Sequence, residues 1–208
     1  MKEVKIKEHT KRILVPMDFS EQAIVGLDHA AMLAKELDAE IVMLSVVEES
    51  SNLSGIIGKA LDMDAATINI LKQQDELFSQ YQKNGIRMEP MVSRGSVYKE
   101  IIRVSEMLAP ELLVMSTNGT PHDMSKRFVG SNAYRVAREV KVPVVTVHGQ
   151  VPVKSIKKIV FPFMLERKSR EKVGLCLHYA RIFNAQIDVV ALASNDDEEK
   201  TLNVQTKQ

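Results

Sequence analysis

The residues with the clearest chemical potential lie between Val114 and Asn132, in the sequence VMSTNGTPHDMSKRFVGSN. The pattern predicts a short buried strand over Leu112–Met115, a polar loop that contains glycine, and a helix that opens at Gly130. Free backbone N–H groups converge where such a loop enters a helix, and the helix dipole adds partial positive charge. The stretch could therefore bind an anion such as a phosphate. The alternative is a βα turn that uses glycine only for its backbone freedom.

Other reactive residue types do not gather into a catalytic set. The same loop carries His122, Lys126 and Arg127, which could neutralise phosphate charge or could be solvated loop residues. The five histidines lie on different predicted elements, so they are not a metal set. The lysine of a P-loop is missing, and no nucleophile stands beside an evident base. We therefore expect a binding or sensing protein, with at most slow ATP hydrolysis.

Composition and charge narrow the class of protein. The chain has 208 residues, which is more than one common domain and less than two. Its formal net charge of +1 gives no basic field for nucleic acid or an anionic membrane, and no run of 18 apolar residues is present. The single cysteine, Cys176, excludes an internal disulfide, and its place on the apolar face of a predicted helix favours an inert buried thiol. We expect a cytoplasmic protein that binds neither nucleic acid nor membrane.

The elements that would position the glycine loop alternate between strand and helix. They are predicted at Ile13–Met17, Ser20–Leu37, Glu40–Val47, Asp62–Gln82, Ile86–Val92, Val97–Leu108, Leu112–Met115, Ser131–Val140 and Val142–Val147. This alternation predicts a parallel sheet with helices on both faces. Pro90 and Pro143 place the third and fifth strands at edges of the sheet.

The second predicted helix follows a segment without a clear pattern. Glu48–Ala60 is rich in serine and glycine and indicates an exposed loop or a short helical excursion. The helix after it is predicted to be amphipathic, with Asn84-Gly85 as its C-cap. Its apolar stripe is predicted from five residues, Ile68, Leu71, Leu77, Phe78 and Tyr81.

A partial internal repeat follows the fifth strand. A shift of 146 residues, without a gap, places Ile13 on Ile159 and Pro16 on Pro162. The predicted domains are therefore 1–149, a linker at 150–157 and an incomplete second copy at 158–208, with a strand at 159–163, a helix at 168–183 and a strand at 186–193. Two strands and one helix cannot cover their own apolar surfaces. We expect a truncated or proteolysed chain, or a half-domain that docks on the first domain or on another subunit.

The sequence resembles the universal stress protein family. The resemblance rests on ILVPMDFSE at Ile13–Glu21, SVVEE after the second strand, the glycine loop before GSN, and VPVVTV, and it spans Arg12–Val147. The partial copy at Lys158–Ala193 would make the chain a tandem-type member. The resemblance implies a five-stranded parallel α/β sheet in the order 3-2-1-4-5, the adenine nucleotide alpha hydrolase-like fold. One branch of the family binds ATP through the motif G-2x-G-9x-G-[S/T].

The resemblance assigns candidate nucleotide-binding residues position by position. The adenine and ribose side would consist of Pro16, Met17, Asp18 and Val46, and the phosphate loop of Met115, Ser116, Gly119, Gly130, Ser131 and Asn132. The implied strand order puts the first and fourth strands at the topological switch point, so Asp18 and the glycine loop would face each other. The second copy has Phe163-Met164 at the place of Met17-Asp18, so any ligand site should belong to the first copy.

The motif departs from the family pattern at two points. Ser116 stands where the motif has its first glycine, and ten residues instead of nine separate Gly119 from Gly130. The Ser116 side chain could obstruct a phosphate, or its hydroxyl could replace a donor. Three hypotheses follow: a nucleotide-binding stress sensor; a member that works through protein interaction, in which the strand after Val142 pairs two subunits; and slow ATP hydrolysis with Asp18 and a divalent cation, Mg²⁺ or Mn²⁺.

Overall fold

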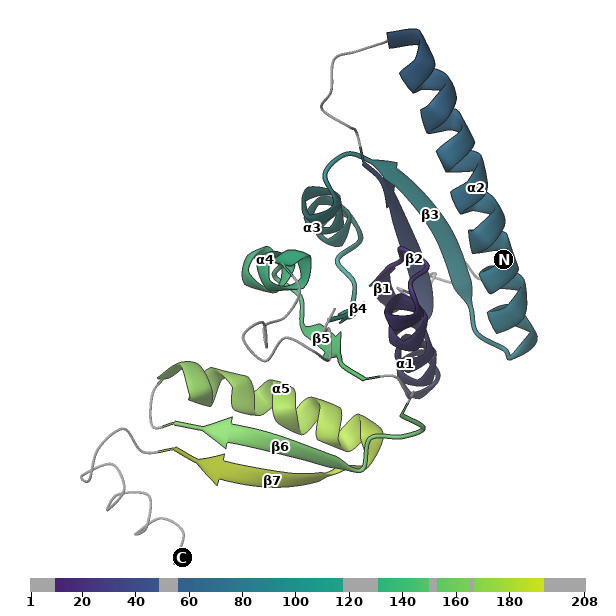
Figure 1. The fold of residues 1–208 in the computed structure, drawn as a ribbon. Coiled ribbons are helices and arrows are strands. Elements are labelled where there is room, and N and C mark those ends of the chain that lie inside the picture. Colours follow the sequence, from purple (N-terminus) through teal and green to yellow (C-terminus); the bar gives the residue numbers. More distant parts are fainter. Residues whose placement is uncertain (1–9, 49–55, 118–130, 150–152, 165–166, 193–208) are drawn as a thin grey trace, which may run out of the picture. The chain divides into compact units, whose positions relative to one another are not determined.

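The computed structural model describes residues 10–48, 56–117, 131–149, 153–164 and 167–192, and the chain divides into two compact units, Met1–Pro152 and Val153–Gln208. The first unit contains a five-stranded sheet in the order β3-β2-β1-β4-β5, in which all pairings are parallel (Figure 1). Its elements are β1 (Arg12–Pro16), α1 (Glu21–Leu37), β2 (Glu40–Val47), α2 (Ile56–Lys83), β3 (Met88–Arg94), α3 (Val97–Leu108), β4 (Leu112–Ser116), α4 (Ser131–Glu139) and β5 (Val144–Val147). The predicted fold class and strand order are confirmed.

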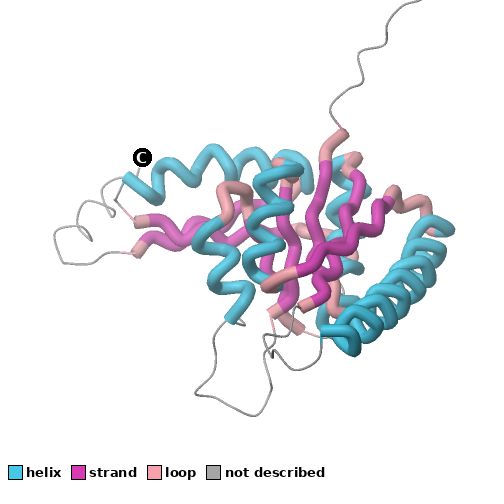
Figure 2. The backbone as a smooth tube through the Cα atoms, turned by 90° about the horizontal axis from the view of Figure 1, so that it is seen from above, coloured by secondary structure: helices cyan, strands magenta, loops and turns pink. Residues whose placement is uncertain are grey.

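Helices cover both faces of this sheet, with α1 and α2 on one side and α3 and α4 on the other (Figures 1 and 2). The central strand β1 is a continuous apolar run because both of its faces are covered, and Ile13, Leu14 and Val15 are at most 1% exposed. On the side of α3 and α4, Leu14 and Leu113 pack in one cluster with buried residues of those two helices. The core therefore extends over both faces of the sheet, and this cluster fills the space between the sheet and the helices α3 and α4.

The strand β3 is an edge strand, as Pro90 predicts, although it begins and ends two residues later than the sequence indicated. The N–H of Ile41 donates to Arg87 O (2.9 Å), and the N–H of Gly95 donates to Val47 O (3.0 Å). Since hydrogen-bonding residues alternate along a strand, the even-numbered Pro90 turns its nitrogen away from β2. The missing N–H of the proline therefore costs no bond in the ladder.

The helix α2 differs from its prediction in length and in buried face. It begins at Ile56, inside the segment for which the sequence indicates an exposed loop or a short helical excursion, and the second alternative agrees with the structure from Ile56 onward. Ile68 and Leu71, two of the five residues predicted for the apolar stripe, are 55% and 49% exposed, whereas Gln74 is 1% exposed. The physical reason is that the amide nitrogen of Gln74 bonds to the sheet, so a polar side chain can occupy a position on the buried face of the helix.

The C-terminal end of α2 is hydrogen-bonded to α1. The Tyr81 hydroxyl donates to Asp28 Oδ1 (2.6 Å), and burial together with this carboxylate raises the pKa of Tyr81 well above its usual value. The helix ends as predicted, because Gly85 adopts a φ of 75° and the N–H of Ile86 returns to Tyr81 O.

The second unit consists of β6 (Lys158–Phe163), α5 (Arg167–Phe183) and β7 (Gln186–Ala191), and its two strands are parallel. Ile159 pairs with Ile187, as Ile13 pairs with Ile41 in the first unit, so the same 146-residue shift relates both pairs. Cys176 is partly exposed, so the prediction of a buried thiol is wrong; the short unit supplies too few elements to cover α5 fully. Within the described part of the chain, no helix is long and apolar enough to cross a membrane.

Candidate functional site

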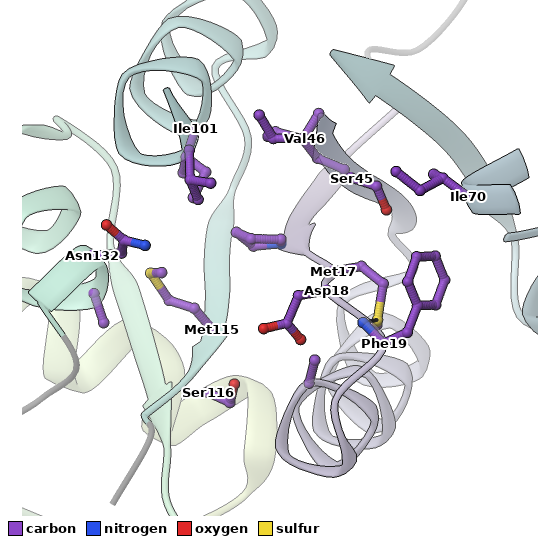
Figure 3. A pocket seen from close by; sticks show the side chains of 15 residues that line it. Met17, Asp18, Phe19, Ser45, Val46, Ile70, Ile101, Met115, Ser116 and Asn132 are labelled. Carbon is purple, nitrogen blue, oxygen red and sulfur yellow. Dashed lines mark hydrogen bonds between the residues drawn. The ribbon is translucent and has the colours of Figure 1, made fainter. Parts of the chain in front are cut away.

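A cavity of about 350 Å³ opens at the carboxyl ends of β1, β2 and β4 (Figure 3). Such a volume lies in the range of small-molecule sites, and the carboxyl edge of a parallel sheet at the switch point is where ligands of open α/β folds bind. Its lining residues are Pro16, Met17, Asp18, Phe19, Ala23, Leu44, Ser45, Val46, Ile70, Val97, Ile101, Met115, Ser116, Asn132 and Ala133.

Seven of the ten residues that the resemblance assigned line this cavity. They are Pro16, Met17, Asp18, Val46, Met115, Ser116 and Asn132. Gly119 and Gly130 lie outside the described residues, as do His122, Lys126 and Arg127. Ser131 is the first residue of α4, and its side chain lies outside the described part of the structure.

Asp18 lies at the end of β1 and has a structural role beside any binding role. Its Oδ1 accepts the N–H of Ser20 (3.0 Å) and the hydroxyl of Ser20 (2.6 Å). The Ser20 oxygen in turn accepts the N–H of Ala23 (3.2 Å) and caps α1, as the sequence predicted. Asp18 is itself exposed, so its carboxylate is positioned by the turn and still open to a ligand in the cavity.

Ser116 ends β4 and faces α1. A Cβ built on Gly26 of α1 would lie 3.5 Å from the Ser116 nitrogen and 3.7 Å from the Ser116 Cβ. The helix therefore approaches the end of β4 closely at a residue that has no side chain. This packing holds the serine that replaces the first glycine of the family motif.

The turn between β1 and α1 contains an unusual backbone conformation. Phe19 has a φ of 62°, in the left-handed region that bulky residues rarely adopt, and its N–H faces Met17 Sδ at 3.4 Å. Its ring lies beside Met17 on the side of the cavity nearest Ile70 (Figure 3). Strained residues of this kind cluster at functional sites.

A charged clamp positions α3, which contributes Val97 and Ile101 to the cavity. Glu100 accepts hydrogen bonds from the Ser93 hydroxyl and from Nε and Nη2 of Arg103 (2.9 and 2.8 Å). These bonds, first those from Arg103 and then that from Ser93, hold the pKa of Glu100 below its usual value. Gly95 completes the turn with a φ of 139°, and a Cβ there would lie 3.2 Å from Glu100 Cγ.

The cavity wall is mostly apolar, and among the described lining residues Asp18 is the one with a formal charge. Within that described part, no group of three or more His, Cys, Asp or Glu residues could hold a metal ion. The arrangement can take up a flat apolar ring with a polar group near Asp18. Any neutralisation of phosphate charge must come from residues other than these.

Several lining residues were not predicted. Phe19 stands within the DFS sequence that carried the resemblance, so its neighbours could have indicated it. Ser45 stands within the SVVEE sequence that also carried the resemblance, whereas Ile70 lies on α2, and nothing in its local pattern separates it from an ordinary core position. Only the packing of α2 on the sheet brings Ile70 to the cavity.

A model of the universal stress protein family matches residues 9–148, more than half of the chain. The chain belongs to the universal stress protein family. A universal stress protein of Methanocaldococcus jannaschii is 27% identical over 143 residues, which cover 66% of this chain and 81% of that relative.

Solved structures of other family members share the fold. A universal stress protein from Archaeoglobus fulgidus superposes with a TM-score of 0.73 at 19% identity and covers 96% of this chain and 72% of its own. Another structure from Archaeoglobus fulgidus, in complex with dAMP, gives a TM-score of 0.52 at 19% identity and covers 68% of this chain and all of its own (100%). At this identity the likeness establishes the fold of this family member and not its ligand.

Proposed function

We propose that this universal stress protein binds an adenine nucleotide in the cavity at the ends of β1, β2 and β4 and acts as a nucleotide-dependent sensor module in a stress response. The observation that carries the proposal is that residues from three separate strands and from α4, assigned by motif position alone, line one cavity of ligand size. The relative that binds dAMP supports the choice of an adenine nucleotide.

The geometry of the cavity divides the nucleotide between two environments. The mostly apolar lining suits the base, because apolar surfaces stabilise a ring by burial. The Asp18 carboxylate suits hydroxyl or amino donors of the ligand and repels phosphate. The phosphates would therefore extend toward the start of α4, where backbone N–H groups and the helix dipole favour an anion. If ATP carries Mg²⁺ or Mn²⁺, Asp18 is the described lining carboxylate that could help to hold the ion.

The Asp18 carboxylate should contribute strongly to this binding. The change Asp18→Asn removes the charge but keeps an oxygen that can accept from Ser20, whereas Asp18→Ala also weakens the start of α1. Since bonds to charged groups are worth about 1.5 to 3 kcal/mol, we expect Asp18→Asn to weaken AMP binding by about ten- to a hundredfold. Isothermal titration calorimetry measures the change.

The titration of the wild-type chain decides the proposal itself. If ATP, ADP and AMP all fail to bind with a Kd below about 1 mM, the proposed function is wrong. A retained affinity in Asp18→Asn, with an unchanged unfolding midpoint, would mean that nucleotide binds but not at this carboxylate.

We propose protein interaction as a second candidate function, since β5 is an edge strand whose Val144 and Val145 are only partly buried. An exposed strand edge can pair with the same edge of a second copy. Thr146→Pro would remove a backbone donor and should dissociate such a dimer in analytical ultracentrifugation. A wild-type chain that sediments as a monomer at about 100 μM would exclude pairing in that range.

We also propose that residues 158–208 are an incomplete second family domain joined by a linker at 150–157, and that the chain works in the cytoplasm. The identical register of β6-β7 and β1-β2 supports the repeat. The likeness to the Archaeoglobus fulgidus protein, which covers 96% of this chain, supports a tandem arrangement. The lone cysteine is consistent with a reducing compartment.

A further inference from the structure

A buried amide from α2 reaches the sheet beside the cavity. Gln74 is 1% exposed, and its Nε2 lies 3.2 Å from Met43 O, 3.0 Å from Met91 O and 3.1 Å from Ser45 Oγ. The two backbone carbonyls can only accept hydrogen bonds, so the nitrogen of the amide, not its oxygen, must face them. Ser45 Oγ therefore serves as an acceptor for Gln74.

This arrangement leaves the hydroxyl hydrogen of Ser45 without a protein acceptor among the described residues. The Gln74 nitrogen cannot accept it, and the buried Gln74 Oε1 makes no hydrogen bond within the same described part. Ser45 is 1% exposed, so bulk water does not satisfy the donor either. A buried hydroxyl normally finds a partner, and a donor left without one requires an explanation.

The cavity is the place where that partner can bind. Ser45 lines the cavity, and its oxygen points to the region between Met17, Phe19 and Ile70 (Figure 3). These three neighbours are apolar, so in this part of the wall the hydroxyl is the isolated polar group. An isolated donor in an apolar wall gives specificity, because a ligand that lacks the matching acceptor leaves the donor unpaired.

We propose that Ser45 is a specificity-determining residue that donates its hydroxyl hydrogen to an unprotonated ring nitrogen of the bound base, and that Gln74 is the positioning residue that sets the direction of this donor. The inference rests on the proposed function, because the ligand is an adenine nucleotide. Adenine presents three such acceptors, N1, N3 and N7. An aromatic ring without a nitrogen at the matched position would be bound less well.

The test compares AMP with its 1-deaza, 3-deaza and 7-deaza analogues by calorimetry on the full chain, in wild type and in Ser45→Ala. We expect the wild type to bind one analogue about tenfold more weakly than AMP, a difference of about 1.4 kcal/mol. Ser45→Ala should bind AMP about tenfold more weakly and should no longer distinguish AMP from that analogue. Ser105→Ala is the matched control, because Ser105 is a buried serine of α3 that does not line the cavity.

A second variant, Ser45→Cys, serves if Ser45→Ala does not fold. It keeps the shape of the side chain but is a weaker donor, so it should lose part of the affinity for AMP. The proposal is overturned if Ser45→Ala retains the wild-type affinity for AMP, or if its discrimination among the three analogues is unchanged. Nucleotide binding with no dependence on Ser45 overturns this inference alone. No binding of AMP, ADP or ATP to the wild type overturns the proposed function as well.

Discussion

Leu113→Ala should lower the free energy of unfolding of the first unit by about 3 to 4 kcal/mol, the largest effect on stability that we expect from a single side chain. Leu113 lies on β4, is 0% exposed and belongs to the cluster that contains Leu14, Ile101 and Val136. The change removes buried surface and leaves a cavity between the sheet and the helices α3 and α4. Close packing on both faces gives the site little room to collapse.

The measurement must report on the first unit, because the chain divides into two compact units that need not unfold together. Hydrogen exchange followed by mass spectrometry over residues 12–16 and 112–116 gives this resolution. We expect amide exchange there to accelerate by more than about a hundredfold. Leu71→Ala is the control, because Leu71 is 49% exposed, and it should change stability by less than about 0.5 kcal/mol. An equal effect of both changes would contradict the burial of β4.

The strands of the first unit could be predicted well from the sequence because the core strands are short apolar runs. Ile13–Val15 and Leu112–Val114 contain only residues that bury readily, and proline at position 90 marks an edge by removing a backbone donor. These signals are local. They reach the strand order only with help from the family resemblance, since nothing within one strand specifies its neighbours.

The buried face of α2 could not be predicted well, because it contains polar residues while apolar residues of the same helix are exposed. Its buried line passes through Gln74 and ends at Tyr81, both of which bond to polar groups of other elements. Ile68 and Leu71 lie on the exposed side of the helix although they are apolar. A buried polar residue is visible in a sequence only if its partners are known, and Met43 and Met91 lie 31 and 17 residues away.

The residues of the candidate site, too, could be predicted only where a sequence motif marks them. Pro16, Asp18 and Ser116 were found through their motif positions, and they line one cavity. The structural role of Asp18 in the turn before α1 could have been read from Asp-Phe-Ser, which has the spacing of an Asx turn. Ser45 opens the SVVEE motif and could have been indicated in the same way, but Ile70 reaches the cavity only through the packing of α2 on the sheet, which no local signal specifies.

The second large effect is expected at Gly26, where two different substitutions should change the free energy of unfolding in opposite directions. In Gly26→Ala the new Cβ would make ordinary contacts, at 3.5 Å from Ser116 N and 3.7 Å from Ser116 Cβ. Alanine is also favoured over glycine inside a helix by up to about 1 kcal/mol. We therefore expect the free energy of unfolding of Gly26→Ala to equal or exceed that of the wild type.

Gly26→Leu should have the opposite result. The additional carbons have no space between α1 and the end of β4, so the helix or the strand must shift, at a cost of about 1 to 3 kcal/mol. The shift moves Ser116, which lines the cavity, and should weaken AMP binding by at least about tenfold if the proposed function holds. Thermal unfolding and calorimetry, performed on both variants, separate the two consequences.

The pair of variants discriminates between a packing role and a binding role for the end of β4. Gly26→Ala adds one methyl group and should leave AMP affinity unchanged, so a loss of affinity there would mean that the backbone near Ser116 tolerates no change at all. Gly26→Leu with reduced stability and unaltered affinity would show that the nucleotide does not contact the end of β4. The serine in place of the first motif glycine would then have no part in binding, and the Asp18 side of the cavity would have to supply the affinity alone.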